Sequence, residues 1–221
     1  MNGNSNISNF KKYIVPFSSA LFLNSIPLIG VIFFGWKIFP VVFLFWFENV
    51  SIGILNVFKI LLCQTKNVFE KIGNIFASVF FTFHYGMFTF VHGVFVVVLF
   101  GGLLNSKGNK DPFSTAYILI EKYQLYYPML AVFGAYFVSF ISEYIIKKEY
   151  ENAKVKELMS KPYGRIVVLH LAILFGGFLI LSLGSPIYAL ILLILLKTGY
   201  DIKPYIKQKN KKSKNGYQKT F

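Results

Sequence analysis

Long apolar runs separated by short polar segments dominate the chain. A hydrocarbon layer about 30 Å thick takes roughly 20 helical residues to cross. Six apolar runs can be compared with that length: residues 13–35, 38–62, 72–104, 125–146, 163–183 and 186–196. The pattern predicts an all-α fold, a polytopic transmembrane bundle of about six membrane-spanning helices.

The run at 186–196 is the shortest of the six, so the segment before it decides the number of crossings. Gly184, Ser185 and Pro186 either turn the chain between two crossings or kink one long helix. Glycine and proline together are typical of turns, which favours two crossings. We therefore expect a tail at 1–12, a single transmembrane domain at 13–202 and a basic tail at 203–221.

Composition supports a membrane location. The 221 residues are 55% hydrophobic and 19% aromatic, and the mean hydropathy is +0.57. This is more apolar surface than one soluble core of this size can bury. We therefore expect the lipid bilayer to be the first partner of the chain.

The basic residues predict an orientation. Of the 23 lysines and arginines, four (Lys37, Lys107, Lys110 and Lys122) fall on one side of a six-helix topology and the other 19 on the side that holds both termini. Cytoplasmic segments of membrane proteins are rich in lysine and arginine. We therefore predict a multi-pass protein of the cell membrane with both termini in the cytoplasm.

The same topology accounts for most of the formal charge of +14, so we expect no nucleic acid partner. The basic tail can attract anionic lipid headgroups, since each lysine near the surface contributes on the order of 1 kcal/mol. The candidate lipid-binding residues are Lys207, Lys209, Lys211, Lys212 and Lys214.

Two segments outside the apolar runs have patterns of their own. Residues 111–128 begin with an aspartate cap and a proline and are rich in tyrosine, which is typical of a helix anchored at the interface; a lid over a substrate is the alternative. Residues 142–164 alternate in charge, which predicts that the fourth helix extends into the cytoplasm until Pro162 stops it.

Polar side chains interrupt the apolar runs at a few positions: Asn24, Glu48, Asn49, Asn56, His84, His92 and His170. A carboxylate in the bilayer costs several kcal/mol unless it is protonated, paired or hydrated, so Glu48 should face the bundle interior and find a donor. Counted from the predicted boundaries, Glu48 and His84 lie at depths of roughly 21 and 18 Å, His170 at roughly 9 Å and His92 at roughly 30 Å. We therefore predict that Glu48 pairs with His84.

Three interpretations of these polar residues remain open. They are hydrogen-bonded packing elements between helices that approach closely at glycines (Gly53, Gly86, Gly93, Gly176 and Gly177). Alternatively, they line a proton or ion path, which makes a proton- or ion-coupled carrier the first specific hypothesis. The third interpretation is a metal or haem site between helices, held by His84, His170 and Glu48.

Sequence motifs do not favour one interpretation over another. The chain has no HExxH pair, no phosphate-binding glycine loop and no GxSxG elbow, so enzymatic activity is an open question. Cys63 is the only cysteine, so neither an intrachain disulfide nor a cysteine-ligated metal cluster can form. No cofactor can be assigned.

Three segments resemble an uncharacterised family of bacterial and archaeal integral membrane proteins, a domain of unknown function. They are "FWFENVSIGILNVFKIL", "FFTFHYGMFTFVHGVF" and the stretch from "PYGRIVVLH" to "LKTGYDI". The resemblance implies that a set of polar and glycine residues belongs together, and it implies no reaction, substrate or cofactor. The set is Trp46, Glu48, Asn49, Asn56, Lys59, His84, Tyr85, Gly86, His92, Gly93, His170, Lys197 and Asp201.

Overall fold

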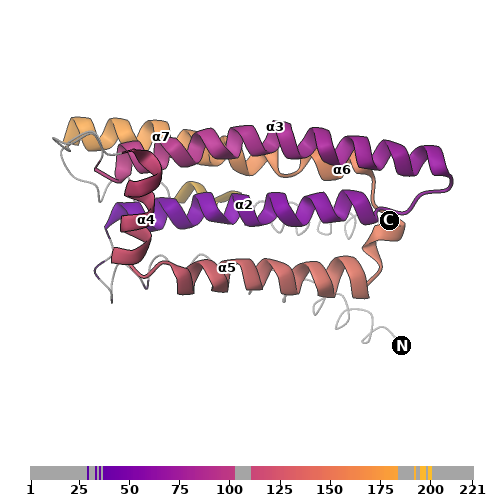
Figure 1. The fold of residues 1–221 in the computed structure, drawn as a ribbon. Coiled ribbons are helices and arrows are strands. Elements are labelled where there is room, and N and C mark those ends of the chain that lie inside the picture. Colours follow the sequence, from indigo (N-terminus) through magenta and orange to yellow (C-terminus); the bar gives the residue numbers. More distant parts are fainter. Residues whose placement is uncertain are drawn as a thin grey trace, which may run out of the picture.

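The regular structure of the chain is helical throughout the part that is described. The computed structural model describes residues 37–102, 111–183 and 195–197, and the single positions 29, 33, 35, 192, 199 and 200. Its elements are α2 (Ile38–Leu62), α3 (Val68–Phe100), α4 (Pro112–Lys122), α5 (Tyr126–Ser139), the π-helix η2 (Phe140–Ile146), the 3-10 helix η3 (Glu149–Glu151), α6 (Val155–Ser160) and α7 (Tyr163–Leu183) (Figure 1). The predicted all-α fold is confirmed.

Four helices are long and apolar enough to cross a membrane. They cover Ile38–Leu62, Val68–Phe100, Tyr126–Ile146 and Val155–Gly176. These four candidate spans indicate a membrane protein. The run at 13–35 and most of 186–196 lie outside the described residues, as do both tails and the lysines at 207–214.

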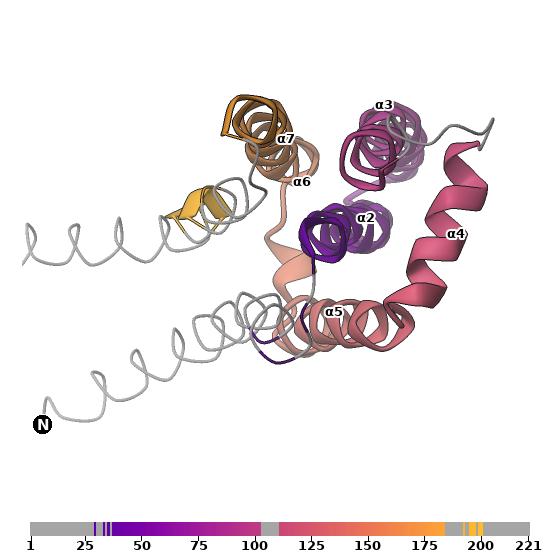
Figure 2. The ribbon, with the colours of Figure 1, turned by 90° about the vertical axis from the view of Figure 1, so that its left-hand side faces the viewer.

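The α2 helix lies at the centre of the bundle. Seen end-on, it is surrounded by α3, α4, α5 and the α6–α7 pair (Figure 2). Within the most apolar part of each span, 67% of α2 is buried, against 17% of Tyr126–Ile146. Large apolar side chains cover the outer faces instead, for example Phe83 (77% exposed) and Leu130 (70%). The outer helices therefore present a surface suited to lipid, and α2 is shielded by protein.

Helix α3 begins four residues before the predicted start at residue 72. The side chain of Asn67 accepts a hydrogen bond from the Glu70 backbone N–H (2.8 Å), and the Glu70 carboxylate accepts one from the Lys66 N–H (2.8 Å). The first bond satisfies an amide group that the first turn leaves free, and the second holds the residue that precedes the cap. The polar cap therefore sets the start of the helix, and the apolar run begins only afterwards.

Helix α4 crosses the end of the bundle at a steep angle to the long helices (Figures 1 and 2). Asp111 caps it as predicted, accepting hydrogen bonds from the N–H groups of Phe113 and Ser114 (both 2.9 Å). The Ser114 hydroxyl also donates to Asp111, and together these bonds hold the pKa of the Asp111 carboxyl below its usual value. The segment is thus a short transverse helix between the ends of α3 and α5.

The predicted extension of the fourth helix as far as Pro162 is wrong. The helix ends at Ile146, and Lys148 takes a left-handed conformation (φ 55°) that turns the chain back. The returning segment is held against α2, because the Asn56 amide donates to the Leu158 carbonyl (2.9 Å) and the Cys63 thiol donates to the Ala153 carbonyl (3.1 Å). The charge alternation therefore covers the end of η2 and the segment 147–162, which docks on α2 and which we call the return segment.

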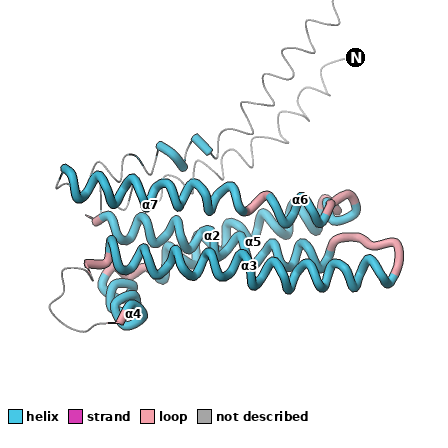
Figure 3. Tube along the Cα trace, turned by 90° about the horizontal axis from the view of Figure 1, so that it is seen from above, coloured by secondary structure: helices cyan, strands magenta, loops and turns pink. Residues whose placement is uncertain are grey.

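The last candidate span also begins earlier in the chain than predicted. The prediction placed its start at Tyr163, whereas the candidate span begins at Val155. Helices α6 and α7 follow nearly the same line, with a short turn at residues 161–162 between them (Figure 3). Tyr163 and the residues after it consequently lie deeper in the bundle than the sequence suggested.

Candidate ion-pair site around Glu48

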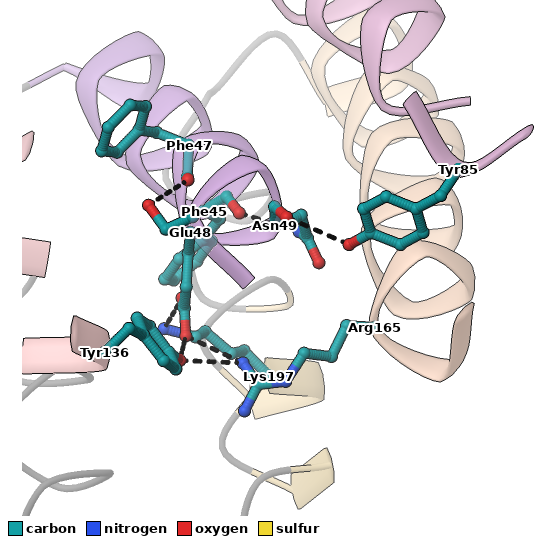
Figure 4. A network of polar contacts seen from close by, with 9 residues as sticks. Phe45, Phe47, Glu48, Asn49, Tyr85, Tyr136, Arg165 and Lys197 are labelled. Atoms are coloured by element: carbon teal, nitrogen blue, oxygen red, sulfur yellow. Dashed lines mark hydrogen bonds and ion pairs between the residues drawn. The ribbon is translucent and has the colours of Figure 1, made fainter. Parts of the chain in front are cut away.

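Glu48 lies near the middle of α2 and is 4% exposed. Arg165 Nη1 lies 2.8 Å from its Oε1 atom, and Lys197 Nζ lies 2.5 Å from its Oε2 atom. The Tyr136 hydroxyl also donates to Oε1 (Figure 4). An ion in this position loses its hydration, so three donors from three other parts of the chain offset the cost of burying the carboxylate.

The donors are themselves held in place. Arg165 Nη1 also donates to the Tyr136 oxygen (3.1 Å), and its guanidinium lies over the Tyr136 ring, 5.8 Å from the centroid. Lys197 Nζ lies 4.3 Å from the centroid of the Phe45 ring. Such contacts between cations and aromatic rings stabilise charges away from water. Glu48, Tyr136, Arg165 and Lys197 therefore form one connected cluster, which we call the Glu48 cluster.

Asn49 lies beside the cluster and has an unsatisfied atom. Its Nδ2 donates to the Phe45 carbonyl (2.9 Å), and its backbone carbonyl accepts from the Tyr85 hydroxyl (3.0 Å; Figure 4). Its buried Oδ1 receives no hydrogen bond from any described residue. A cavity of about 30 Å³ lies here, lined by Glu48, Asn49, Arg165, Lys197 and other residues. This volume is enough for a water molecule, and Oδ1 offers it an acceptor.

The predicted Glu48–His84 pair is wrong. His84 Nδ1 instead lies 2.6 Å from the Tyr163 hydroxyl, and the ring stacks on Phe80. The similar depths predicted for Glu48 and His84 are consistent with the structure, because Tyr85, next to His84, donates to the carbonyl of Asn49, next to Glu48. Successive helical residues differ by about 100° in direction, so when Tyr85 faces α2, His84 points away toward α7.

His92 and His170, which the sequence placed at different depths, are in contact. His92 Nε2 lies 3.0 Å from His170 Nδ1, and His92 Nδ1 lies 2.7 Å from the Phe88 carbonyl oxygen. A carbonyl only accepts, so His92 Nδ1 carries a proton; while His92 is neutral, its Nε2 accepts from the His170 Nδ1–H. The depth estimate failed because the span begins at Val155.

The family comparison covers nearly the whole chain. The model for a family of unknown function (DUF6498) matches residues 12–218. The chain belongs to this family. The resemblance drawn from the sequence segments is thereby confirmed, and the family description assigns no activity. No curated protein and no solved structure matches the chain.

In this DUF6498 chain the three residues expected to hold a metal are not brought together. His84 contacts Tyr163, His170 contacts His92, and Glu48 contacts Arg165 and Lys197. Among the described residues, no group of three or more His, Cys, Asp or Glu side chains is placed to hold a metal ion. Asn56 is also separate, since its amide binds the Leu158 carbonyl and anchors α6.

The sequence did not place Tyr136 or Arg165 in the site, and it included Lys197 only through the set of residues that the family resemblance implied. Arg165 carried a signal, because it is the only arginine among 23 basic residues. Arginine is favoured over lysine in buried ion pairs, since its planar group donates several hydrogen bonds and is weakly hydrated. Tyr136 carried none, because it is one of 14 tyrosines.

Proposed function

We propose that this protein is a proton- or ion-coupled membrane carrier with the Glu48 cluster at its centre. The proposal includes six crossings of the cell membrane and cytoplasmic termini. An ionisable side chain inside a membrane bundle is costly, and such residues are typical of ion pathways and proton relays. The Glu48 cluster is such a group, placed halfway along the most buried helix.

The observation that carries the proposal is the position of Arg165 between cavities. Its side chain lines the cavity of about 30 Å³ beside Asn49. It also lines two larger pockets, of about 220 and 520 Å³, nearer the end of the bundle where the chain turns at 147–154. The ion pair between Arg165 and Glu48 therefore lies where a path through the bundle would be closed.

The chemistry of the cluster suggests how coupling would work. Protonation of Glu48 removes the negative charge that holds Arg165 and Lys197. The two cations then lose most of their attraction to α2, because charge pairs in a low-dielectric interior are strong only while both partners are charged. A proton arriving at Glu48 thus releases the cations, and departure of the proton restores the closed pair.

A flux assay tests the proposal. The full chain is reconstituted in liposomes with an internal pH dye, and a pH gradient is imposed in the presence of a panel of inorganic ions and small organic anions. Glu48→Gln keeps the shape of the side chain but removes its charge, and it should reduce solute-dependent proton flux at least tenfold. Glu121→Gln, which removes an exposed carboxylate from α4, should leave the flux unchanged.

Two results would overturn the carrier. One is the absence of any solute-dependent proton flux with the unmodified chain across the panel. The other is equal flux in the unmodified and Glu48→Gln proteins, which would show that the cluster takes no part in coupling.

A further inference from the structure

A lysine-lined pocket of about 520 Å³ lies where the return segment meets α2. Small-molecule sites in proteins usually have volumes of about 300–1,000 Å³. Two elements supply its basic walls: α2, and the segment between the end of η2 and the start of α7. Its lysines are Lys59, Lys147, Lys148, Lys154 and Lys161, and we call it the lysine pocket.

The walls of the lysine pocket are fixed by hydrogen bonds between these elements. The Tyr144 hydroxyl donates to the Lys59 carbonyl (2.6 Å), and the Gln64 N–H donates to the Tyr150 carbonyl (3.0 Å). On the other side, the Asn56 side-chain amide donates a hydrogen bond to the Leu158 carbonyl. These bonds tie η2 and the return segment to α2 at several points, so the pocket is part of the fold.

The charges in the lysine pocket are unbalanced. Two glutamates, Glu149 and Glu157, line it beside the five lysines. Among the described residues, only one of these lysines is ion-paired, Lys148 with Glu151 at 3.9 Å. Lys59 is partly buried, and its Nζ lies 5.4 Å from the Tyr144 ring centroid. Glu149 and Glu143 act electrostatically on Lys59, as does Lys161, so carboxylates offset part of the positive charge and the lining keeps an excess of lysines that suits an anion.

Membrane topology alone does not account for five lysines lining one pocket. The positive-inside tendency places lysines on one side of the membrane without directing them to a common cavity. Lys66 and Lys71 lie at the same end of the bundle, are exposed, and do not line the pocket. They show what lysines with a topological role alone look like in this chain.

We propose that the lysine pocket binds an anion carrying a phosphate group. Several ammonium groups suit a multiply charged anion, and lysine binds phosphate as a point charge. The volume exceeds that of phosphate itself, so the ligand carries an organic part. Two sources share this chemistry: a phosphorylated solute and the headgroup of an anionic lipid. Binding here does not depend on the carrier proposal, since it requires no transport.

Binding measurements on the full chain in nanodiscs test the proposal. With neutral lipid, inorganic pyrophosphate is titrated by calorimetry; in a second arm, phosphatidylglycerol is added and the thermal unfolding temperature is measured. Lys154→Gln with Lys161→Gln removes two exposed pocket lysines, and Lys66→Gln with Lys71→Gln is the matched control at the same end. Lys59→Gln tests the partly buried lysine of the pocket.

We expect the pocket variant to lower pyrophosphate affinity about tenfold and the control variant less than twofold. If a lipid headgroup is the natural occupant, phosphatidylglycerol raises the unfolding temperature of the control more than that of the pocket variant. If a solute is the occupant, only the pyrophosphate arm separates them. The proposal is overturned if neither probe binds, or if pocket and control variants lose affinity equally, which would indicate general surface attraction.

Discussion

Glu48 draws its partners from three distant parts of the chain. Tyr136 comes from α5, Arg165 from the first turn of α7, and Lys197 from beyond the described end of that helix. Removing one member of a buried ion pair leaves an uncompensated charge and typically costs 3–5 kcal/mol. The cluster therefore links segments that are far apart in the sequence.

Glu48 and Arg165 should be energetically coupled. Glu48→Ala and Arg165→Ala should each lower the free energy of unfolding by about 3–5 kcal/mol, and the double variant should cost clearly less than their sum, by about 0.5–3 kcal/mol. Glu48→Ala combined with His84→Ala should be additive, because these side chains do not touch. Unfolding of the purified chain in mild detergent measures both cycles. Additive losses for Glu48 and Arg165 would contradict the ion pair as a source of stability.

The sequence indicated part of this site. The cost of a buried carboxylate showed that Glu48 needs donors, and helical spacing placed His84 near its depth. The direction of each side chain could not be obtained, since a turn of 100° separates a partner from a neighbour. Arg165 was counted as a cytoplasmic charge because the predicted span began at Tyr163, and Lys197 because it follows the apolar run that ends at residue 196. Each lies at a predicted boundary, so neither was considered as a partner of Glu48.

At the scale of elements, the contact between α2 and α3 depends on two glycines facing two aromatic rings. A Cβ atom on Gly93 would lie 2.7 Å from the Trp46 indole, and one on Gly53 would lie 2.5 Å from the Tyr85 ring. The Trp46 Nε1–H also donates to the Thr89 carbonyl at 2.6 Å. Each helix thus provides a glycine that receives the ring of the other.

Alanine substitutions separate this role from helix propensity. Gly93→Ala should lower the free energy of unfolding by about 1–3 kcal/mol, because the indole must move. Gly86→Ala is the control on the same helix, since nothing lies within 4 Å of a Cβ there, and it should be neutral or slightly stabilising. Thermal unfolding in detergent compares them. Equal effects of the two changes would show that the Trp46 contact is not tight.

Helix positions were predictable where apolar runs and helices coincide. The bounds of α2 agree with the predicted 38–62, and those of the fourth apolar run agree within one residue. Gly86 was expected to allow close helix approach and does not. The return segment could not be foreseen, since its position depends on the distant residues Asn56 and Cys63, whereas charge alternation reports only local preference.

The whole molecule has two chemically different ends. Helix α3 is antiparallel to α2, because Tyr85 contacts Asn49 and the earlier Asn74 contacts the later Cys63. It is parallel to α7, because His84 contacts Tyr163 and His92 contacts His170. The lysine pocket therefore lies at one end of the bundle, and α4 crosses the other (Figure 1). This polarity supports the proposed orientation, with the lysine pocket facing the cytoplasm.

Thiol labelling of intact cells tests this orientation. Lys122→Cys, in the last turn of α4, should react with a reagent that cannot cross the membrane. Asn152→Cys, in the return segment, should react only after the cells are broken. Both positions are exposed, and the native Cys63 is buried, so the unmodified chain gives the background. Labelling of both variants from outside, or of Asn152→Cys alone, would reverse or remove the proposed topology.

Cys63 also makes the chain its own reporter of local opening. The thiol is 7% exposed, it donates to the Ala153 carbonyl, and burial raises its pKa, so little reactive thiolate is present in the closed structure. Ala153 belongs to the wall of the lysine pocket. The rate at which Cys63 reacts with an added thiol reagent therefore measures how often the return segment separates from α2, and no substitution is needed. A ligand that holds the pocket closed would lower the reaction rate of Cys63.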